Sequence, residues 1–288
     1  MTQFDVFEVL VPETRMPTLT WFWLTTRMDR QAVLADFDEQ IRRHPEPDTP
    51  DGYVEHDGTV IRTMSVGDGW TGVTWCDLDQ VSADAVIAAQ IRRFAELSRP
   101  WEWKHYSYDQ TADLPDRLLA AGFTPEPAET LLVAEIADLT LDVPPPEGVE
   151  LLAVVDQQGV EALVLVHDEV FGGDHSAVGR TLLAGLTRQP STAAAVVSLA
   201  GQIPIAAARV EFHPGSDFAS LWGGATLPAW RGRGVFRSLV AHRATLASAR
   251  GFRYLQVDAT PDSRPILRRL GFVELATTTP FTHPGGAG

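Results

Sequence analysis

Apolar residues recur with two different spacings along the second half of the chain. Runs that alternate apolar and polar residues predict strands, whereas apolar residues three and four positions apart predict helices. On this basis the sequence predicts strands at 149–155, 193–200, 203–212, 218–227 and 254–257, a last strand after Gly271, and helices at 157–170, 177–186, 236–249 and 265–270. Short turns at Gly201-Gln202 and 213–216 join the three middle strands into an antiparallel meander. The predicted order is β-α-α-β-β-β-α-β-α-β.

Part of this order recurs in the first half. The pattern there predicts a hairpin around Asp57-Gly58, a strand at 71–76 and a helix at 83–97. When Gly122-Phe123 is aligned with Gly271-Phe272, six of the 16 positions that end at these pairs are identical. The repeat predicts two similar domains of the α/β class (α+β), each with a mixed, mostly antiparallel sheet flanked by helices.

A proline-rich stretch marks the expected domain boundary. Residues 142–148 include three consecutive prolines, which favour a stiff, extended spacer and cannot join a helix or a central strand. We therefore expect a first domain at 1–141, a linker at 142–148 and a second domain at 149–288.

The composition narrows the possible partners. With 44% hydrophobic and 21% charged residues the chain is close to the globular average, and its net charge of −15 argues against generic binding to nucleic acid or to an anionic membrane. The single cysteine, Cys76, excludes an intramolecular disulfide and a Cys-rich metal site. His167, Asp168, Asp174 and His175 match no common metal-ligand spacing, so we expect no metal and a solvated loop between two helices.

The segments expected in a membrane or secreted protein are not evident. The longest apolar runs span only a handful of residues, far fewer than the roughly 18–20 that cross a bilayer. The stretch 1–10 contains Asp5 and Glu8 and has neither a basic start nor an apolar region typical of a signal peptide. We expect a cytoplasmic protein without a membrane partner.

Charge is distributed unevenly between the two halves. Residues 1–148 contain 11 basic and 27 acidic residues, whereas 149–288 contain 12 and 11. The stretch 231–269 alone contains nine arginines against two acidic residues, Asp258 and Asp262. An anionic ligand explains this excess, and the alternative is a helix face that arginines merely solvate.

The segment 221–240 has the composition of a diphosphate cradle. A predicted strand runs into Pro228, an Arg-Gly-Arg-Gly turn follows at 231–234, and a helix begins directly afterwards. Glycines let backbone N–H groups curl around an anion, and the start of a helix adds free N–H groups and a positive dipole end. A Rossmann fingerprint needs a third glycine, and a P-loop needs Gly-Lys-Ser/Thr, so neither fits.

This segment resembles the GNAT superfamily of acyl-CoA-dependent N-acetyltransferases. The family signature is Arg/Gln-x-x-Gly-x-Gly/Ala between a bulged strand and a helix, and 231–236 meets it except at Phe236, which leaves less room than a small residue. The stretch 266–272 resembles the closing helix and the Leu-Gly-Phe strand entry of the family. The resemblance covers about residues 149–283 and more weakly 50–140, and it implies a tandem GNAT protein.

The resemblance implies where acetyl-CoA, the expected co-substrate, would bind. In the family, coenzyme A separates two neighbouring parallel strands, and its pantetheine arm pairs with the strand before the glycine turn. A bulge is then expected at Gly223-Gly224, where the Gly224 N–H would polarise the thioester carbonyl. The implied coenzyme-binding residues are Ala225, Thr226, Leu227, Arg231, Gly232, Arg233, Gly234, Val235, Phe236 and Arg237.

The proton-transfer groups are less well marked. Many family members have a tyrosine four residues before the last Gly-Phe to protonate the leaving thiolate, and Leu267 occupies that position. Each candidate base also has a structural alternative, as a turn cap or a solvated strand residue. The candidates that the predicted strands direct toward the cleft are Asp258, Glu211, His213 and His283.

The first domain resembles a degenerate copy that does not bind coenzyme A. Its residues 80–85, equivalent to 229–234, contain no glycine and no arginine, and Asp84 would repel a diphosphate. This domain would shape the substrate site or stabilise the second domain. Its six tryptophans, at 21, 23, 70, 75, 101 and 103, are expected mostly in core packing.

The sequence thus predicts an N-acetyltransferase that transfers acetyl from acetyl-CoA to a primary amine, by direct attack in a ternary complex. A small-molecule acceptor is favoured because tandem members of the family act on small molecules. Two alternatives remain: a non-catalytic acyl-CoA sensor, indicated by Leu267 and Phe236, and a protein-lysine acetyltransferase, whose basic substrates the acidic first half would attract. The identity of the acceptor and the oligomeric state remain open.

Overall fold

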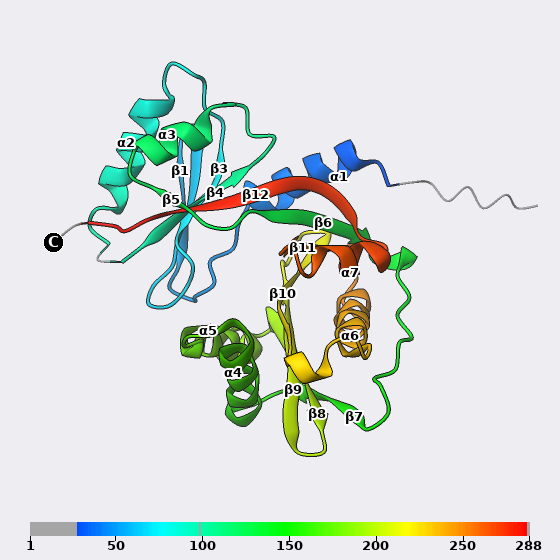
Figure 1. Ribbon diagram of the computed structural model, residues 1–288. Coiled ribbons are helices and arrows are strands. Elements are labelled where there is room, and N and C mark those ends of the chain that lie inside the picture. The colour runs from blue at the N-terminus through cyan, green and yellow to red at the C-terminus, as the bar shows by residue number, and fades with distance from the viewer. Residues whose placement is uncertain (1–27, 98, 287–288) are drawn as a thin grey trace, which may run out of the picture.

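The computed structural model describes residues 28–97 and 99–286 (Figure 1). The segment 1–10, on which the expected localisation partly rests, and Trp21 and Trp23 lie outside these ranges. None of the helices that the structure describes is long and apolar enough to span a membrane.

The predicted elements form in both halves. In the first half the elements are α1 (Arg30–Phe37), the π-helical turn η1 (Asp38–Arg42), β1 (Tyr53–Asp57), β2 (Val60–Met64), β3 (Gly72–Cys76), α2 (Ala83–Phe94), β4 (Trp101–Tyr106), α3 (Leu114–Ala120), β5 (Thr124–Pro125), β6 (Glu129–Glu135) and η2 (Ile136–Asp138). In the second half they are β7 (Val149–Val154), α4 (Gln157–Phe171), α5 (Ser176–Thr187), β8 (Ala193–Ala200), β9 (Ile203–Phe212), β10 (Phe218–Thr226), η3 (Pro228–Trp230), α6 (Val235–Ala249), β11 (Tyr254–Ala259), α7 (Arg264–Arg269) and β12 (Val273–His283). The expected linker, 142–148, forms no helix or strand.

The two halves share one twelve-stranded sheet. Its order is β1-β2-β3-β4-β12-β6-β11-β10-β9-β8-β7, and β5 pairs with β12 beside this path. Strand β6 of the first half lies antiparallel between β11 and β12 of the second half. Strand β12 pairs with β6 through its first residues and with β4 through its last, so that it runs from one half into the other, as the red ribbon of Figure 1 shows. Each half therefore contributes a strand to the sheet of the other.

The internal repeat is confirmed by matching geometry. Gly122 and Gly271 have φ angles of +94° and +109°, in the region that favours glycine. In both copies the N–H of the following phenylalanine donates to a leucine carbonyl five residues earlier, at 3.0 Å in the first half and 3.1 Å in the second. The leucines concerned, Leu118 and Leu267, are both fully buried.

Helices cover both faces of the second-half sheet but leave part of one face open. Helices α6 and α7 pack on one face, where Val240, Ala244 and Leu267 join a core with β10 and β11. On the opposite face α4 and α5 cover β8 and β9, while α1 packs through Val33 and Phe37 over β6, β10 and β11. Between α1 and α4, polar side chains replace the apolar core.

Candidate active site

Strands β10 and β11 form a fork. They pair in parallel at only three positions, from Phe218 opposite Tyr254 to Ser220 opposite Gln256, and then diverge. Beyond this point β10 contains a bulge, because Trp222 opposes Arg209 whereas Ala225 opposes Ala207. Gly223 and Gly224 thus face a single residue of β9, and Gly223 has a φ of +57°. The bulge lies where the sequence predicted it.

Two buried side chains hold this bulge from opposite faces of the sheet. On α4, His167 donates through Nε2 to the Gly223 carbonyl at 2.8 Å. On α6, Arg243 donates through Nη1 to the carbonyls of Arg209 at 3.1 Å and Trp222 at 3.4 Å. Burial lowers the pKa of His167 to about 4 and that of Arg243 to about 9, so the imidazole is neutral at pH 7. The expectation that His167 lies in a solvated loop is wrong, because its side chain is 1% exposed.

The glycine turn leaves the start of α6 free. Gly232 and Gly234 have φ angles of +74° and +91°, and Gly234 precedes the helix without any side-chain cap. Helix α4, in contrast, is capped by Asp156. The first N–H groups of a helix have no partner inside the helix, so those of α6 are available to an anion. A Cβ at Gly232 would meet no atom within 4 Å, and one at Gly234 would meet only Pro146, at 3.9 Å.

The side chains of the turn have distinct positions. Arg231 Nε donates to the Thr226 carbonyl at 3.1 Å and thereby ties the turn to the end of β10, while the Arg233 guanidinium lies 4.9 Å from the centre of the Trp230 ring. Arg237 lines a cavity of about 260 Å³ between α6, α7 and residues 139–143. The Phe236 ring points inward, since a Cβ at Gly224 would lie 2.9 Å from it.

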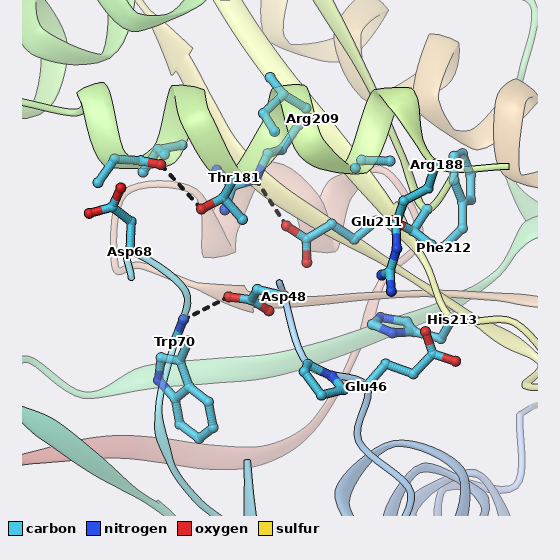
Figure 2. Close-up of a pocket in the computed structure, with 17 residues that line it drawn as sticks. Glu46, Asp48, Asp68, Trp70, Thr181, Arg188, Arg209, Glu211, Phe212 and His213 are labelled. Carbon is cyan, nitrogen blue, oxygen red and sulfur yellow. Dashed lines mark hydrogen bonds and ion pairs between the residues drawn. The ribbon is translucent and has the colours of Figure 1, made fainter. Parts of the chain in front are cut away.

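A cavity of about 340 Å³ opens where β10 and β11 diverge. Residues at alternate positions on neighbouring strands line this cavity. Their side chains form a polar stripe that spans both halves. The stripe consists of Glu102, Lys104, Glu129, Gln256, Asp258, Ser220, Trp222, Arg209, Glu211 and His213. A second hollow of about 310 Å³, shown in Figure 2, shares Glu46, Asp48, Trp70, Arg209, Glu211 and His213 with the first.

The expected base Asp258 lies in this cavity but is engaged in an ion pair. Lys104 Nζ, from the first half, donates to Asp258 Oδ2 at 2.6 Å, and the two side chains are 15% and 3% exposed. Burial on its own would lower the pKa of Lys104, but Asp258, Tyr106 and Glu102 raise it above its ordinary value. The lysine therefore stays charged and holds the carboxylate.

Glu211 and His213 also line the cavity and have partners. Arg209 Nε donates to Glu211 Oε1 at 3.0 Å. The Ser220 hydroxyl lies 2.6 Å from His213 Nε2 and accepts from Gln256 Nε2 at 2.5 Å. Burial lowers the pKa of His213, although the charge of Glu211 opposes that shift.

Within the described part of the chain, Gln256 has a buried oxygen without a partner, and His283 lies outside the cavity. Gln256 Oε1 is buried without a hydrogen-bond partner among the residues that the structure describes. The fourth candidate base, His283, packs its ring against Trp101 and Phe123 outside this cavity.

Several acidic residues of the site have no sequence motif that could have revealed them. Trp70 donates through its backbone N–H to Asp48 at 2.9 Å and through Nε1 to Glu102 at 3.1 Å. Burial, together with the charge of Glu211, raises the pKa of Asp48 to about 6, and these two carboxylates face the same hollow (Figure 2). Burial also raises the pKa of Glu129 to about 7. Such a negative pocket favours a cationic ligand.

The arrangement of these strands is found in known structures. A GCN5-related N-acetyltransferase from Kribbella flavida matches 89% of this chain and 95% of its own length at 19% identity, with a TM-score of 0.63. A tandem GNAT protein from the clavulanic acid biosynthesis pathway matches 83% and 85% at 14% identity and a TM-score of 0.55. The chain has the GNAT fold.

Sequence similarity between this chain and known proteins is much weaker than the similarity in fold. A GCN5-related N-acetyltransferase from Sphaerobacter thermophilus covers 90% of the chain at a TM-score of 0.53, with 14% identity. No protein-family profile matches the sequence, and no curated protein matches it either.

The first copy of the GNAT fold contains a second fork, and Arg42 fills it. Strands β3 and β4 pair in parallel only at Gly72 opposite Glu102 and Val73 opposite Trp103. Arg42 Nε donates to the carbonyl of Thr74 at 3.2 Å, and its guanidinium lies 3.9 Å from the centre of the Tyr106 ring. Salt bridges to Asp38 at 2.9 Å and to Asp109 at 2.8 Å neutralise the charge, and Arg42 is 3% exposed.

A carboxylate ties down the turn that precedes the corresponding helix of the first copy. Asp79 Oδ1 accepts hydrogen bonds from the N–H groups of Val81 and Ser82, both at 2.8 Å, just before α2. Asp84, which the sequence places where a diphosphate would bind, is exposed and pairs with Arg117 at 2.8 Å. The first copy thus fills its fork with the Arg42 side chain, whereas the fork of the second copy opens into a cavity.

Proposed function

We propose that the protein transfers an acetyl group from acetyl-CoA to a primary amine of a small molecule, by direct attack in a ternary complex. The observation that carries the proposal is the fork between β10 and β11, which joins an uncapped glycine turn on one side to an acid-lined cavity on the other. The GNAT fold supports it.

The residues around the turn fit the coenzyme. The open space over Gly232 and Gly234 admits a pyrophosphate, which the N–H groups of 232–237 would bind. Arg237 and Arg269 line the neighbouring cavity and add positive charge. The backbone of 225–227 would hold the pantetheine, and the Gly224 N–H at the bulge would stabilise the oxygen that becomes negative, a contribution of a few kcal/mol.

The acceptor would bind in the cavity between the halves. Carboxylates of both halves line it, which suits an ammonium group, and its volume of about 340 Å³ suits a small molecule. Catalysis would then come mainly from positioning and from backbone polarisation. Leu267 is 1% exposed and has no proton to donate, but a thiol with a pKa near 8.5 needs no enzymatic acid to leave.

Binding of acetyl-CoA by calorimetry tests the coenzyme site. We expect one site per chain, with binding lost in Gly234→Asp because the new carboxylate places bulk and negative charge in the cradle. Gly58→Asp is the matched control, since Gly58 also has a positive φ, of +58°, with open space around it in the β1–β2 hairpin. Equal loss in both variants, or no binding by the wild type, would contradict the proposal.

Turnover with a panel of amines, followed by release of the coenzyme thiol, tests the reaction. Transfer to small primary amines supports the proposal. Binding without any turnover would identify an acyl-CoA sensor, and transfer only to lysine peptides would identify a protein acetyltransferase.

A further inference from the structure

We infer that Glu129, which the first half of the chain supplies, is the general base that accepts the proton of the acceptor ammonium. This inference rests on the proposed function and assigns a catalytic task to the half whose own fork is filled.

The exchange of strands places Glu129 in the site. It is the first residue of β6 and opposes Thr278 of β12, while Leu131, two residues later, opposes Asp258 of β11. Residues two apart in a strand share a face, so Glu129 lies on the face of the sheet that the polar stripe occupies. Glu129 also lines the cavity at the fork.

Glu129 differs from the other candidates because it has no partner. Among the residues that the structure describes, no hydrogen bond or salt bridge involves its carboxylate, whereas Asp258 is held by Lys104 and Glu211 by Arg209. His213 is hydrogen-bonded to Ser220. A carboxylate that is already neutralised by a cation is a poor proton acceptor. Of the other acids that line the cavity, Asp48 and Glu102 accept hydrogen bonds from Trp70 and Glu46 is exposed, so Glu129 is the acid best placed to take a proton.

The charges around Glu129 tune its proton affinity. Burial raises its pKa, Lys104 on β4 lowers it, and Asp258 on β11 and Glu102 on β4 raise it, with a result of about 7. A general base works best when its pKa is near the working pH, because it is then both ionised and basic enough to accept a proton.

The chemical step balances without any further reactant. The carboxylate of Glu129 takes one proton from the acceptor ammonium, and the free amine attacks the thioester carbonyl carbon. The new C–N bond forms, the C–S bond breaks, and the second nitrogen proton passes through water to the thiolate. Glu129 then releases its proton to solvent.

The pH profile of kcat/KM tests the assignment. For the wild type we expect activity to rise through a pKa near 7, because the ionised form is required. Glu129→Gln should lower kcat by about 10²-fold to 10⁴-fold, remove this inflection and leave the KM for acetyl-CoA unchanged. Glu129→Asp should restore part of the activity together with the inflection. The matched control is Glu126→Gln, which removes an exposed carboxylate three residues earlier and should leave kcat and the inflection as in the wild type.

A second readout does not depend on turnover. Infrared difference spectra recorded across pH, without acetyl-CoA, should show a carboxyl band that titrates near 7 in the wild type and is missing in Glu129→Gln. A variant that keeps the inflection, or that changes only KM, would overturn the assignment while the proposed function stands. A wild type that acetylates no amine would overturn both.

Discussion

The two forks of the sheet have similar strand geometry but different side chains. In each half a pair of parallel strands separates after two or three residue pairs, next to the start of a helix. In the second half the helix follows a glycine turn, whereas in the first half Arg42 occupies the fork and the helix follows a turn without glycine that the Asp79 carboxylate ties down. The comparison teaches that the strand geometry alone does not make a coenzyme site. A few side chains decide whether the opening is available.

The largest effect is expected from removal of the arginine that fills the first fork. Arg42→Leu leaves the carboxylate of Asp109, 3% exposed, without its cation, and breaking a buried ion pair from one side costs about 3–5 kcal/mol. Urea unfolding should show this loss in the free energy of unfolding.

A neighbouring arginine provides the control for this change. Arg43→Leu removes an arginine that is 44% exposed, beside a weak pair with Glu39 at 3.9 Å and 4.1 Å from the centre of the Trp75 ring, and should cost about 1 kcal/mol or less. Similar losses in both variants would mean that Arg42 does not support the first fork as described.

A pH-dependent loss of stability is expected at the second fork. His167 has a pKa of about 4 when folded against an ordinary 6.5, so between these values the unfolded chain binds a proton that the folded chain does not. Stability is therefore complete above pH 6.5 and falls by about 3 kcal/mol as the pH drops toward 4.

Unfolding of His167→Gln across pH isolates this contribution. A glutamine amide can still donate to the Gly223 carbonyl but does not titrate, so the variant should lose less stability than the wild type between pH 6.5 and 4. Parallel curves for the two proteins would refute the role of His167 at the bulge.

A smaller effect is expected from the contact between the bulge and α6. Gly224→Ala would place a Cβ 2.9 Å from the Phe236 ring, and overpacking of this kind costs about 1–3 kcal/mol. Phe236→Leu should relieve the cost in the double variant, as measured by thermal unfolding. Gly201→Ala serves as a control, since it is strained at a φ of +62° without any contact, and Phe236→Leu should not relieve its cost.

Local patterns predicted the elements and the glycine turn because both depend on neighbouring residues. The spacing of apolar residues placed the strands and helices of the second half, and the resemblance to the GNAT family placed the bulge at Gly223-Gly224. The sequence could not indicate which strand pairs with β11, since β6 and β12 are both plausible neighbours by composition and long-range packing decides between them.

The surroundings of the candidate proton-transfer residues could be predicted only in part for the same reason. Asp258 lines the cavity at the fork, but its partner Lys104 lies 154 residues earlier in the chain and belongs to no motif. Glu129 and Arg42 likewise acquire their surroundings only when the two halves meet. Arg243 was counted as part of an arginine-rich stretch, and its burial beneath the bulge could not be read from that count.

The passage of β12 through both halves has a consequence for synthesis on the ribosome. Phe281, near the end of the chain, is part of the buried cluster that includes Trp101, Trp103 and Phe123 of the first half. Domains that close on their own residues fold in order as they emerge, but this cluster is incomplete until β12 has been translated. The first half therefore cannot complete its core before β12 emerges, and a nascent chain stopped at the linker exposes the edge of β4 that β12 later covers.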